Sequence, residues 1–251
     1  MHRAGYLALN LEGWHYEPFR IVDLPAAVAA LRALGLRGVG VSMPFKLNII
    51  PLLDELEPVA AAIGAVNTVV NEEGRLIGYN TDWLGAIRAL EEVRPIRGAR
   101  VLLLGAGGAA RAVAYGLRER GATLSILNRN TERAAHLAEV CGASVAPPEH
   151  ARSRGPYDIL INATSVGMYE VDPGPPILPE ALHPDLLVMD IVYKPINTAL
   201  VRAARTVGAA VVHGGRMLLH QAAAQFELYT GRPAPLAAME SALQKAIAPS
   251  G

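Results

Sequence analysis

The chain has one cysteine, few aromatic residues and no excess charge of either sign. A single cysteine, Cys141, excludes an internal disulfide framework and suits a reducing compartment such as the cytoplasm. Lys and Arg number 23, as do Asp and Glu, so the basic surplus typical of nucleic-acid binding is missing. Aromatic residues make up only 5 %, which leaves little material for stacking bases. We therefore expect a cytoplasmic protein that binds no nucleic acid.

Long apolar runs and clustered metal ligands are missing too. No apolar run reaches about 18 residues, and the N-terminus has no signal-peptide core, so we expect no membrane association. His213 and His220 are too far apart in sequence for an HExxH-type zinc site, and we expect no metal. The 51 % hydrophobic and 18 % charged residues are typical of a compact globular protein with one large or two small domains.

The most informative segment is a strand, glycine turn and helix at residues 101–113. Four apolar residues run into Gly105-x-Gly107-x-x-Ala110, and an alanine-rich amphipathic helix follows. This is the context in which the dinucleotide-binding fingerprint has meaning, with the phosphates on the N–H groups of the helix N-terminus. The expected cofactor residues of the turn are Gly105, Ala106, Gly107, Gly108, Ala109 and Ala110.

The end of the next expected strand, residues 123–127, indicates which dinucleotide binds. An NAD site has an acidic residue there for the ribose 2′-hydroxyl. This chain has Asn128-Arg129-Asn130 instead, with Arg133 one helical turn later. Two guanidiniums without a carboxylate suit a 2′-phosphate, so the sequence favours NADP over NAD. A surface turn that happens to be basic is the alternative.

Strands alternate with helices along most of the chain, which predicts an α/β protein with largely parallel sheets. We expect a first domain over residues 1–97, completed by C-terminal helices at about 217–248, and a Rossmann domain over 98–216. In the first domain the pattern predicts strands at 16–21 and 38–43, helices at 24–34 and from Pro44, and a hairpin of 66–71 with 75–79.

The first domain would then supply the substrate chemistry. Hydride transfer between an alcohol and a ketone needs a group that takes or returns the hydroxyl proton. Lys46 follows an expected strand and a proline, and Asp82 follows another strand. A lysine near a carboxylate suits that task, although a solvated lysine and an ordinary helix N-cap are the structural alternatives.

Eight ordered segments make the resemblance to a known family specific. The chain resembles the shikimate/quinate dehydrogenase family from end to end. The segments are Val41-Ser-Met-Pro-Phe-Lys46, Ile63-Gly-Ala-Val-Asn-Thr68, Gly78-Tyr-Asn-Thr-Asp82, Gly105-Ala-Gly-Gly-Ala-Ala-Arg111, Asn128-Arg129, Asn162-Ala-Thr-Ser-Val-Gly-Met168, Asp190-Ile-Val-Tyr193 and His220-Gln221.

The resemblance implies two α/β domains around a cleft, and NADP-dependent interconversion of 3-dehydroshikimate and shikimate, a step of aromatic amino-acid biosynthesis. It implies that Lys46 and Asp82 lie beside the reacting hydroxyl of a hydroxy-cyclohexene carboxylate. Monomers and homodimers both suit this family. The other implied residues contact substrate (Ser42, Asn67, Thr81, Tyr193, Gln221), the adenosine phosphate (Asn128, Arg129, Arg133), or the cofactor's ribose and nicotinamide (Thr164, Ser165, Val192, Met217).

Departures from the family pattern keep other functions open. Gly40 stands where an Asn is usual, and Arg216 replaces a Gly near the nicotinamide. The sequence also starts after the family's first strand and its Ser-x-Ser loop, from which we expect weak shikimate binding. The alternatives are a quinate or aminoshikimate dehydrogenase, or a catalytically weak relative that binds NADP.

Overall fold

The computed structural model describes residues 1–168 and 174–247, which form two compact units. The first unit contains Met1–Asp82 and the chain from Gln221 onward, and the second contains Trp83–His220. Both divisions fall within helices, α4 (Asp82–Glu91) and α8 (Gly214–Thr230). A continuous second unit is thus inserted into a discontinuous first one.

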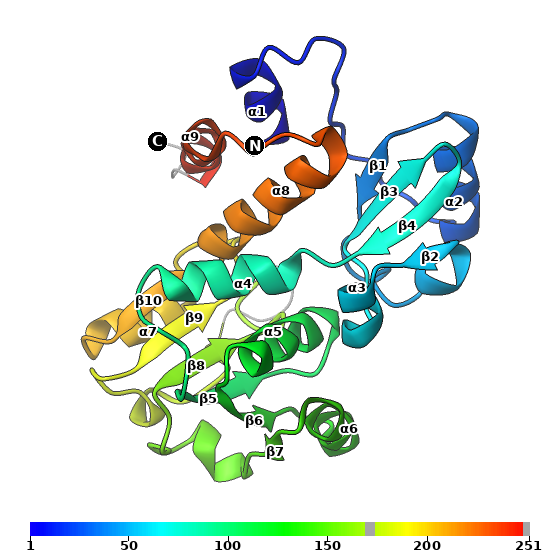
Figure 1. Ribbon diagram of the computed structural model, residues 1–251. Helices are drawn as coiled ribbons and strands as arrows, with labels where there is room; N and C mark the ends of the chain where they lie inside the picture. Colours follow the sequence, from blue (N-terminus) through cyan, green and yellow to red (C-terminus); the bar gives the residue numbers. More distant parts are fainter. Residues whose placement is uncertain (169–173, 248–251) are drawn as a thin grey trace. The chain divides into compact units, whose positions relative to one another are not determined.

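The second unit is built on six parallel strands in the order β10-β9-β8-β5-β6-β7 (Figure 1). Numbered from the unit's first strand, this is the 3-2-1-4-5-6 order of the Rossmann fold. The order reverses between β5 and β8, and ligands of such sheets bind beyond the carboxyl ends of the strands there. The strands are β5 (Arg100–Leu104), β6 (Thr123–Leu127), β7 (Ser144–Val145), β8 (Ile159–Asn162), β9 (Leu187–Asp190) and β10 (Ala210–His213).

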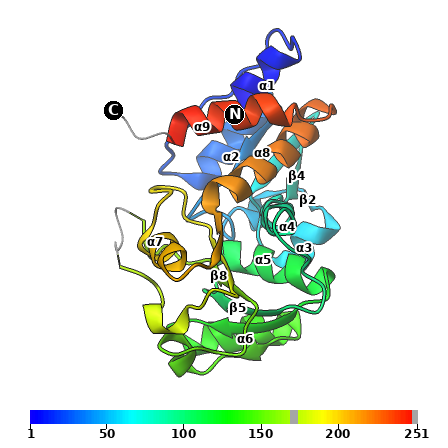
Figure 2. The same cartoon turned by 90° about the vertical axis from the view of Figure 1, so that its left-hand side faces the viewer.

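Both faces of this sheet are covered, which explains its apolar strands. In β5, Val101 and Leu103 join the core beneath α5, whereas Leu102 and Leu104 join the core beneath α7. Figure 2 shows α5 and α7 on opposite sides of β5 and β8. The α/β prediction is therefore confirmed. The helices are α5 (Gly108–Glu119), α6 (Thr131–Cys141) and α7 (Ala199–Thr206).

Residues 83–97, expected in the first domain, pack within the second unit. Ala86, Ile87 and Leu90 of α4 are fully buried in the same core as α5. Gly116 of α5 allows this close approach, because a Cβ there would lie 2.6 Å from Cγ1 of Ile87. The expected range at 217–248 also differs, since the first unit resumes at Gln221 and residue 248 lies outside the described residues.

The first unit has a smaller mixed sheet in the order β1-β3-β4-β2. The predicted hairpin is present as the antiparallel pair β3 and β4, and its turn residues Glu73 and Gly74 have φ values of 52° and 93°. Two positive φ angles match a two-residue hairpin turn. The strands are β1 (Gly38–Gly40), β2 (Glu55–Leu56), β3 (Thr68–Glu72) and β4 (Arg75–Tyr79).

Helices from several parts of the chain complete the first unit. Val28 and Leu31 of α2 pack with Val69 and Leu76 of the hairpin in one core. Gly5 of α1 contacts Phe226 closely, and a Cβ there would lie 2.7 Å from its ring. The helices, besides the end of α8, are α1 (His2–Ala8), α2 (Leu24–Ala33), α3 (Pro58–Ile63) and α9 (Leu236–Ile247).

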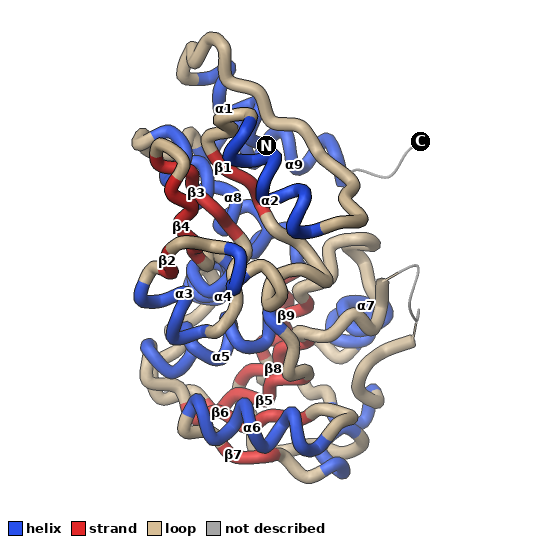
Figure 3. The backbone as a smooth tube through the Cα atoms, turned by 90° about the vertical axis from the view of Figure 1, so that its right-hand side faces the viewer, coloured by secondary structure: helices blue, strands red, loops and turns tan. Residues whose placement is uncertain are grey.

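The strand predicted at residues 16–21 does not form. Pro18 cannot donate to a ladder, and Phe19 is 71 % exposed, so no apolar face is buried there. Figure 3 shows this part of the chain as a long loop between α1 and α2.

The segment after β1 also differs from its prediction. β1 ends at Gly40 instead of continuing to residue 43, and residues 43–49 form turns instead of the helix expected from Pro44. The carbonyl of Lys46 accepts a hydrogen bond from the N–H of Val66 at 2.9 Å. That bond ties the turn to the chain just before β3, in place of a helical bond.

Candidate active site

The β3–β4 hairpin brings together the polar residues at its open end. The N–H of Asn67, just before β3, donates to the carbonyl of Tyr79, at the end of β4, over 3.1 Å. This places the Asn67 side chain beside Thr81 and Asp82, the residues that follow β4. The antiparallel register therefore joins two motifs that are separate in the sequence.

The Asn67 side chain is the centre of the resulting hydrogen-bond network. Its Nδ2 donates to Oγ1 of Thr81 at 2.9 Å and to Oδ1 of Asp82 at 2.9 Å. Its Oδ1 accepts from the N–H of Thr81 at 2.7 Å and from the Thr68 hydroxyl at 2.8 Å. Asn67 is 2 % exposed. Both ends of the amide are used, so the orientation of this side chain is determined by its neighbours.

Lys46 and Asp82 form an ion pair with Nζ 2.5 Å from Oδ2. The two side chains are 16 % and 7 % exposed, so the pair is largely shielded from solvent. Asp82 is the first residue of α4, and its N–H donates to Oδ1 of Asn80 at 3.0 Å. The Asp82 carboxylate binds Lys46 and Asn67. Lys46 is therefore not a solvated lysine, and the Asp82 side chain does not serve as an ordinary helix N-cap.

Two glutamines of α8 extend the network within the first unit. Gln221 Oε1 accepts from Asn67 Nδ2 at 3.2 Å. Gln225 Nε2 donates to the Thr68 hydroxyl at 2.9 Å and to the carbonyl of Asn67 at 3.2 Å. Gln225 was not predicted from the sequence, although its position four residues after Gln221 places both on one helix face.

Two predicted substrate residues lie outside this network. Ser42 follows β1, and its hydroxyl makes a 3.5 Å contact with the carbonyl of Met43. Tyr193 belongs to the second unit and is 42 % exposed. The fold of the first unit thus gathers Lys46, Asn67, Thr81, Asp82 and Gln221 from the predicted set.

The predicted phosphate turn joins β5 to α5 in the second unit. Gly105 has φ +111°, and a Cβ there would lie 2.9 Å from the carbonyl oxygen of Ala163, which follows β8. Gly107 is the N-cap of α5, and a Cβ there would meet nothing within 4 Å. Ala110 is fully buried against the sheet. The turn therefore presents open backbone at a helix N-terminus, as pyrophosphate binding requires.

The turn after β6 holds the basic residues predicted to recognise the 2′-phosphate. Asn130 caps α6, since its Oδ1 accepts from the N–H of Arg133 at 2.8 Å, and Asn128 Nδ2 donates to the carbonyl of Asn130 at 2.9 Å. Arg129 and Arg133 are exposed, and within the described ranges neither guanidinium has a carboxylate partner. Both cations are thus available to an anion.

Three of the remaining predicted cofactor residues follow the central strands, and the fourth, Met217, lies in α8. Thr164 and Ser165 come after β8, and Val192 comes after β9. The Thr164 hydroxyl donates to Oδ1 of Asn162 at 2.6 Å. Val192 is 4 % exposed, and Met217 of α8 is 7 % exposed and packs in the core that contains α5.

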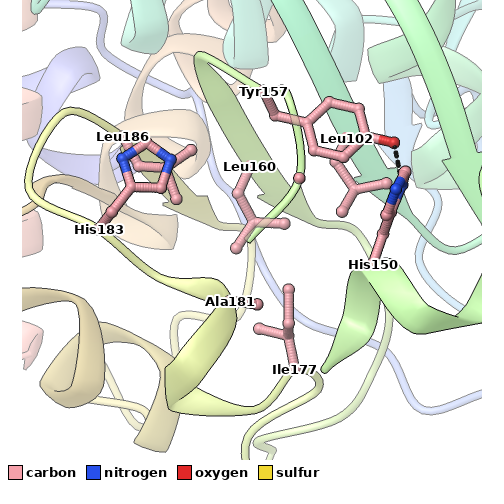
Figure 4. Close-up of a pocket in the computed structure, with 9 residues that line it drawn as sticks. Leu102, His150, Tyr157, Leu160, Ile177, Ala181, His183 and Leu186 are labelled. Atoms are coloured by element: carbon pink, nitrogen blue, oxygen red, sulfur yellow. Dashed lines mark hydrogen bonds between the residues drawn. The ribbon is translucent and has the colours of Figure 1, made fainter. Parts of the chain in front are cut away.

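A separate cavity in the second unit contains none of these residues. Its lining is mostly apolar, and its polar members include His150 and Tyr157, whose side chains share a 2.7 Å hydrogen bond (Figure 4). The space is about 10 Å³, room for about one water molecule. It is too small for a substrate or cofactor.

Metal-binding clusters and membrane-spanning helices are both missing from the described part of the chain. It holds no group of three His, Cys, Asp or Glu side chains placed to bind a metal ion. Across residues 1–168 and 174–247, none of the helices has the length and apolar character needed to cross a bilayer.

Three family models match successive parts of the chain. The model described as "Shikimate dehydrogenase substrate binding domain" matches residues 1–69. "Shikimate / quinate 5-dehydrogenase" matches residues 88–174, and "Shikimate 5'-dehydrogenase C-terminal domain" matches residues 214–244.

Individual relatives match almost the whole chain. The shikimate dehydrogenase (NADP(+)) of Methanothermobacter thermautotrophicus is 43 % identical, over 98 % of this chain and 91 % of that protein. The crystal structure of shikimate 5-dehydrogenase from Thermus thermophilus, in complex with NADP(H) and shikimate, has a TM-score of 0.90 and 39 % identity, covering 98 % of this chain and 92 % of that one. The quinate dehydrogenase of Corynebacterium glutamicum, in complex with NAD, has a TM-score of 0.83 and 33 % identity, with 97 % and 92 % covered. This chain belongs to the shikimate/quinate dehydrogenase family.

Proposed function

We propose that this chain catalyses the reversible, NADP-dependent reduction of 3-dehydroshikimate to shikimate. The observation that carries the proposal is the shielded Lys46–Asp82 pair, held by Asn67 in a chain of this family. The name of the Methanothermobacter thermautotrophicus relative and the contents of the Thermus thermophilus structure support the same reaction. On this proposal the first unit binds substrate and the second unit binds cofactor.

Lys46 and Asp82 are the proposed acid–base pair. Reduction of the ketone leaves an alkoxide that needs a proton, and oxidation of the alcohol requires that proton to leave. The Lys46 ammonium can donate that proton, because its side chain is only 16 % exposed and its Nζ is held by the ion pair with Asp82. Asp82 keeps the ammonium oriented and accepts a hydrogen bond from Asn67 with its other oxygen.

The proposed substrate contacts are the hydroxyls and amides around that pair. The Asn67 amide Nδ2 donates a hydrogen bond to the Thr81 hydroxyl and another to Oε1 of Gln221. Ring hydroxyls of the substrate can both donate to and accept from such groups. Ser42 and Tyr193 are also proposed substrate contacts, because they match substrate-contacting positions of the family.

The residues of the second unit fit an NADP molecule. Open backbone at Gly107 and the N-terminus of α5 suit the pyrophosphate, and Arg129 and Arg133 suit the 2′-phosphate. When bound, the cofactor supplies or accepts the hydride. The remaining proposed contacts are Gly105, Ala106, Gly108, Ala109, Ala110, Asn128, Thr164, Ser165, Val192 and Met217.

We further propose a cytoplasmic protein that is a monomer or a homodimer and binds no nucleic acid. The one cysteine is buried and free, which suits a reducing compartment. The formal net charge of zero gives the chain no net electrostatic attraction for nucleic acid. Light scattering of the purified chain measures its oligomeric state directly.

A substrate panel tests the proposed activity. NADP⁺ reduction is followed with shikimate, quinate and aminoshikimate, and we expect kcat/KM to be highest for shikimate by at least about tenfold. A preference for quinate would replace the proposed substrate with that of the Corynebacterium glutamicum relative. NADP⁺ binding without turnover of any of the three would identify a catalytically weak cofactor-binding protein.

A further inference from the structure

Asp190 is a buried carboxylate at the end of β9 that the proposed chemistry does not use. It is fully buried and lies opposite Asn162, at the end of β8, in the parallel register. Its Oδ1 accepts from Asn162 Nδ2 at 2.9 Å and from the N–H of Val192 at 3.0 Å. Its Oδ2 accepts from the Thr198 hydroxyl at 2.6 Å.

Among the described residues, no cation lies beside the Asp190 carboxylate, so only hydrogen bonds stabilise its charge. Burial raises the pKa of Asp190, and the hydrogen bonds from Thr198, Val192 and Asn162 oppose that rise. A buried charge is seldom the most stable choice for a core position, since apolar replacements are often neutral or stabilising. An apolar side chain at this position could not accept the three hydrogen bonds that Asp190 accepts.

The hydrogen bonds of Asp190 connect it to the two turns that carry proposed cofactor residues. The turn after β9 is bound directly, through the N–H of Val192. The turn after β8 is bound through Asn162, whose Oδ1 accepts from both the N–H and the hydroxyl of Thr164, at 3.1 and 2.6 Å. Asn162 Nδ2 also donates to the carbonyl of Val166 at 3.1 Å. One carboxylate thus links both turns at the carboxyl edge of the sheet.

Thr198 connects the same carboxylate to α7. Its hydroxyl donates to Asp190 and accepts from the N–H of Val201 at 3.1 Å, so it is the N-cap of that helix. Thr198 is 1 % exposed. Asp190, Asn162 and Thr198 are buried, and their polar side-chain atoms all have hydrogen-bond partners, the condition in which a polar network gives a unique geometry.

We propose that Asp190 is a positioning residue, which with Asn162 holds the turns of Thr164 and Val192 in the arrangement that receives the nicotinamide half of the cofactor. This inference rests on the proposed function. It concerns only that half, because the turn after β6, with Arg129 and Arg133, shares none of these hydrogen bonds.

The test compares NADPH with adenosine 2′,5′-bisphosphate, which has the adenosine phosphates but no nicotinamide half. In Asp190→Asn, one acceptor oxygen becomes an NH₂ donor that must face donors already in place. We expect its Kd for NADPH to rise roughly ten- to a hundredfold, with the Kd for adenosine 2′,5′-bisphosphate within about twofold of the parent. The discrimination between NADP and NAD should stay as it is, since both share the nicotinamide.

Variants of α7 keep the test decisive if Asp190→Asn folds poorly. Thr198→Val removes one hydrogen-bond donor to the Asp190 carboxylate and should raise the Kd for NADPH. Thr198→Ser keeps that donor, so its Kd for NADPH should equal that of the parent. Thr206→Val is the matched control, because that hydroxyl lies on the same helix, is exposed, and bonds only within the helix to the carbonyl of Arg202 in the described structure.

The outcomes separate this inference from the proposed function. Equal weakening of both ligands in Asp190→Asn and in Thr198→Val would show a general structural role and overturn the inference. Unchanged NADPH binding in both variants would overturn it as well. Failure of the parent chain to bind NADPH would instead reject the proposed function.

Discussion

Replacing Asn67 with alanine removes both ends of the amide at the centre of the first unit's network. The N–H of Thr81 loses its 2.7 Å acceptor, and Oδ1 of Asp82 loses its 2.9 Å donor. A buried polar group left without a partner costs about 1–3 kcal/mol. Water entering beside the partly exposed Lys46 recovers part of that cost, so we expect a net loss of about 2–4 kcal/mol in the free energy of unfolding.

Activity should fall as well, because Asn67 orients Asp82. A small displacement of an acid–base group costs roughly a hundredfold in rate, and we expect kcat to drop about ten- to a hundredfold. Stability is measured by urea unfolding, and kcat by NADP⁺ reduction with shikimate at temperatures where the variant is folded.

Asn71→Ala, in the strand that directly follows Asn67, provides the matched control. Asn71 is also buried, donates to the carbonyl of Leu36 at 3.0 Å and accepts from the N–H of Gly74 at 2.7 Å, and these bonds lie at the other end of the hairpin from the Lys46–Asp82 pair. We expect it to lose stability while its kcat stays within about threefold of the parent. Equal kcat values for the two variants would refute the role given to Asn67.

Three further changes test other parts of the structure. Arg129→Ala should weaken NADP binding roughly ten- to a hundredfold in calorimetry and leave NAD binding unchanged, since only NADP has the 2′-phosphate; equal losses would reject this contact. Burial lowers the pKa of His2 from 6.5 to about 4, so the neutral ring contributes stability that is complete above pH 6.5 and is lost as the pH falls toward 4. At 1.36 kcal/mol per pKa unit, this contribution is roughly 3 kcal/mol. In His2→Gln, the melting temperature should therefore depend less on pH between about 4 and 6.5 than in the parent. An equal pH dependence in both proteins would show that His2 is not responsible. Gly116→Ala should lower the free energy of unfolding by about 1–3 kcal/mol, because the new Cβ would lie 2.6 Å from Ile87, and a stabilised variant would show that α4 and α5 can move apart.

The parts of the fold that local patterns determine could be predicted from the sequence. The turn at Gly105 and Gly107 is one such part, because its strand, glycines and helix are contiguous and each has a local conformational signal. The β3–β4 hairpin is another, since Glu73-Gly74 gives the turn its positive φ angles. The strand expected at 16–21 does not form because Pro18 lacks a backbone donor and the exposed Phe19 gives the segment no buried face.

The site needed more than local patterns. Lys46 and Asp82 could be named as candidates, but their 2.5 Å contact depends on a long-range bond from Val66 to the Lys46 carbonyl. Gln225 was missed because its role arises only when α8 returns to β3, far away in the sequence. The division at Asp82 was likewise not visible, since α4 continues through it and packs its later residues in the second unit.

The central claim is that this chain transfers hydride between NADP and shikimate with Lys46 as the acid–base group. The most direct measurement is the steady-state rate of 3-dehydroshikimate reduction by NADPH in the parent chain and in Lys46→Met, which keeps the length of the side chain but loses its charge. We predict measurable turnover in the parent, and a kcat lower by roughly two to four orders of magnitude in the variant, with NADPH binding unchanged. Parent-like turnover in a folded Lys46→Met variant, or no NADPH oxidation by the parent, would contradict the account.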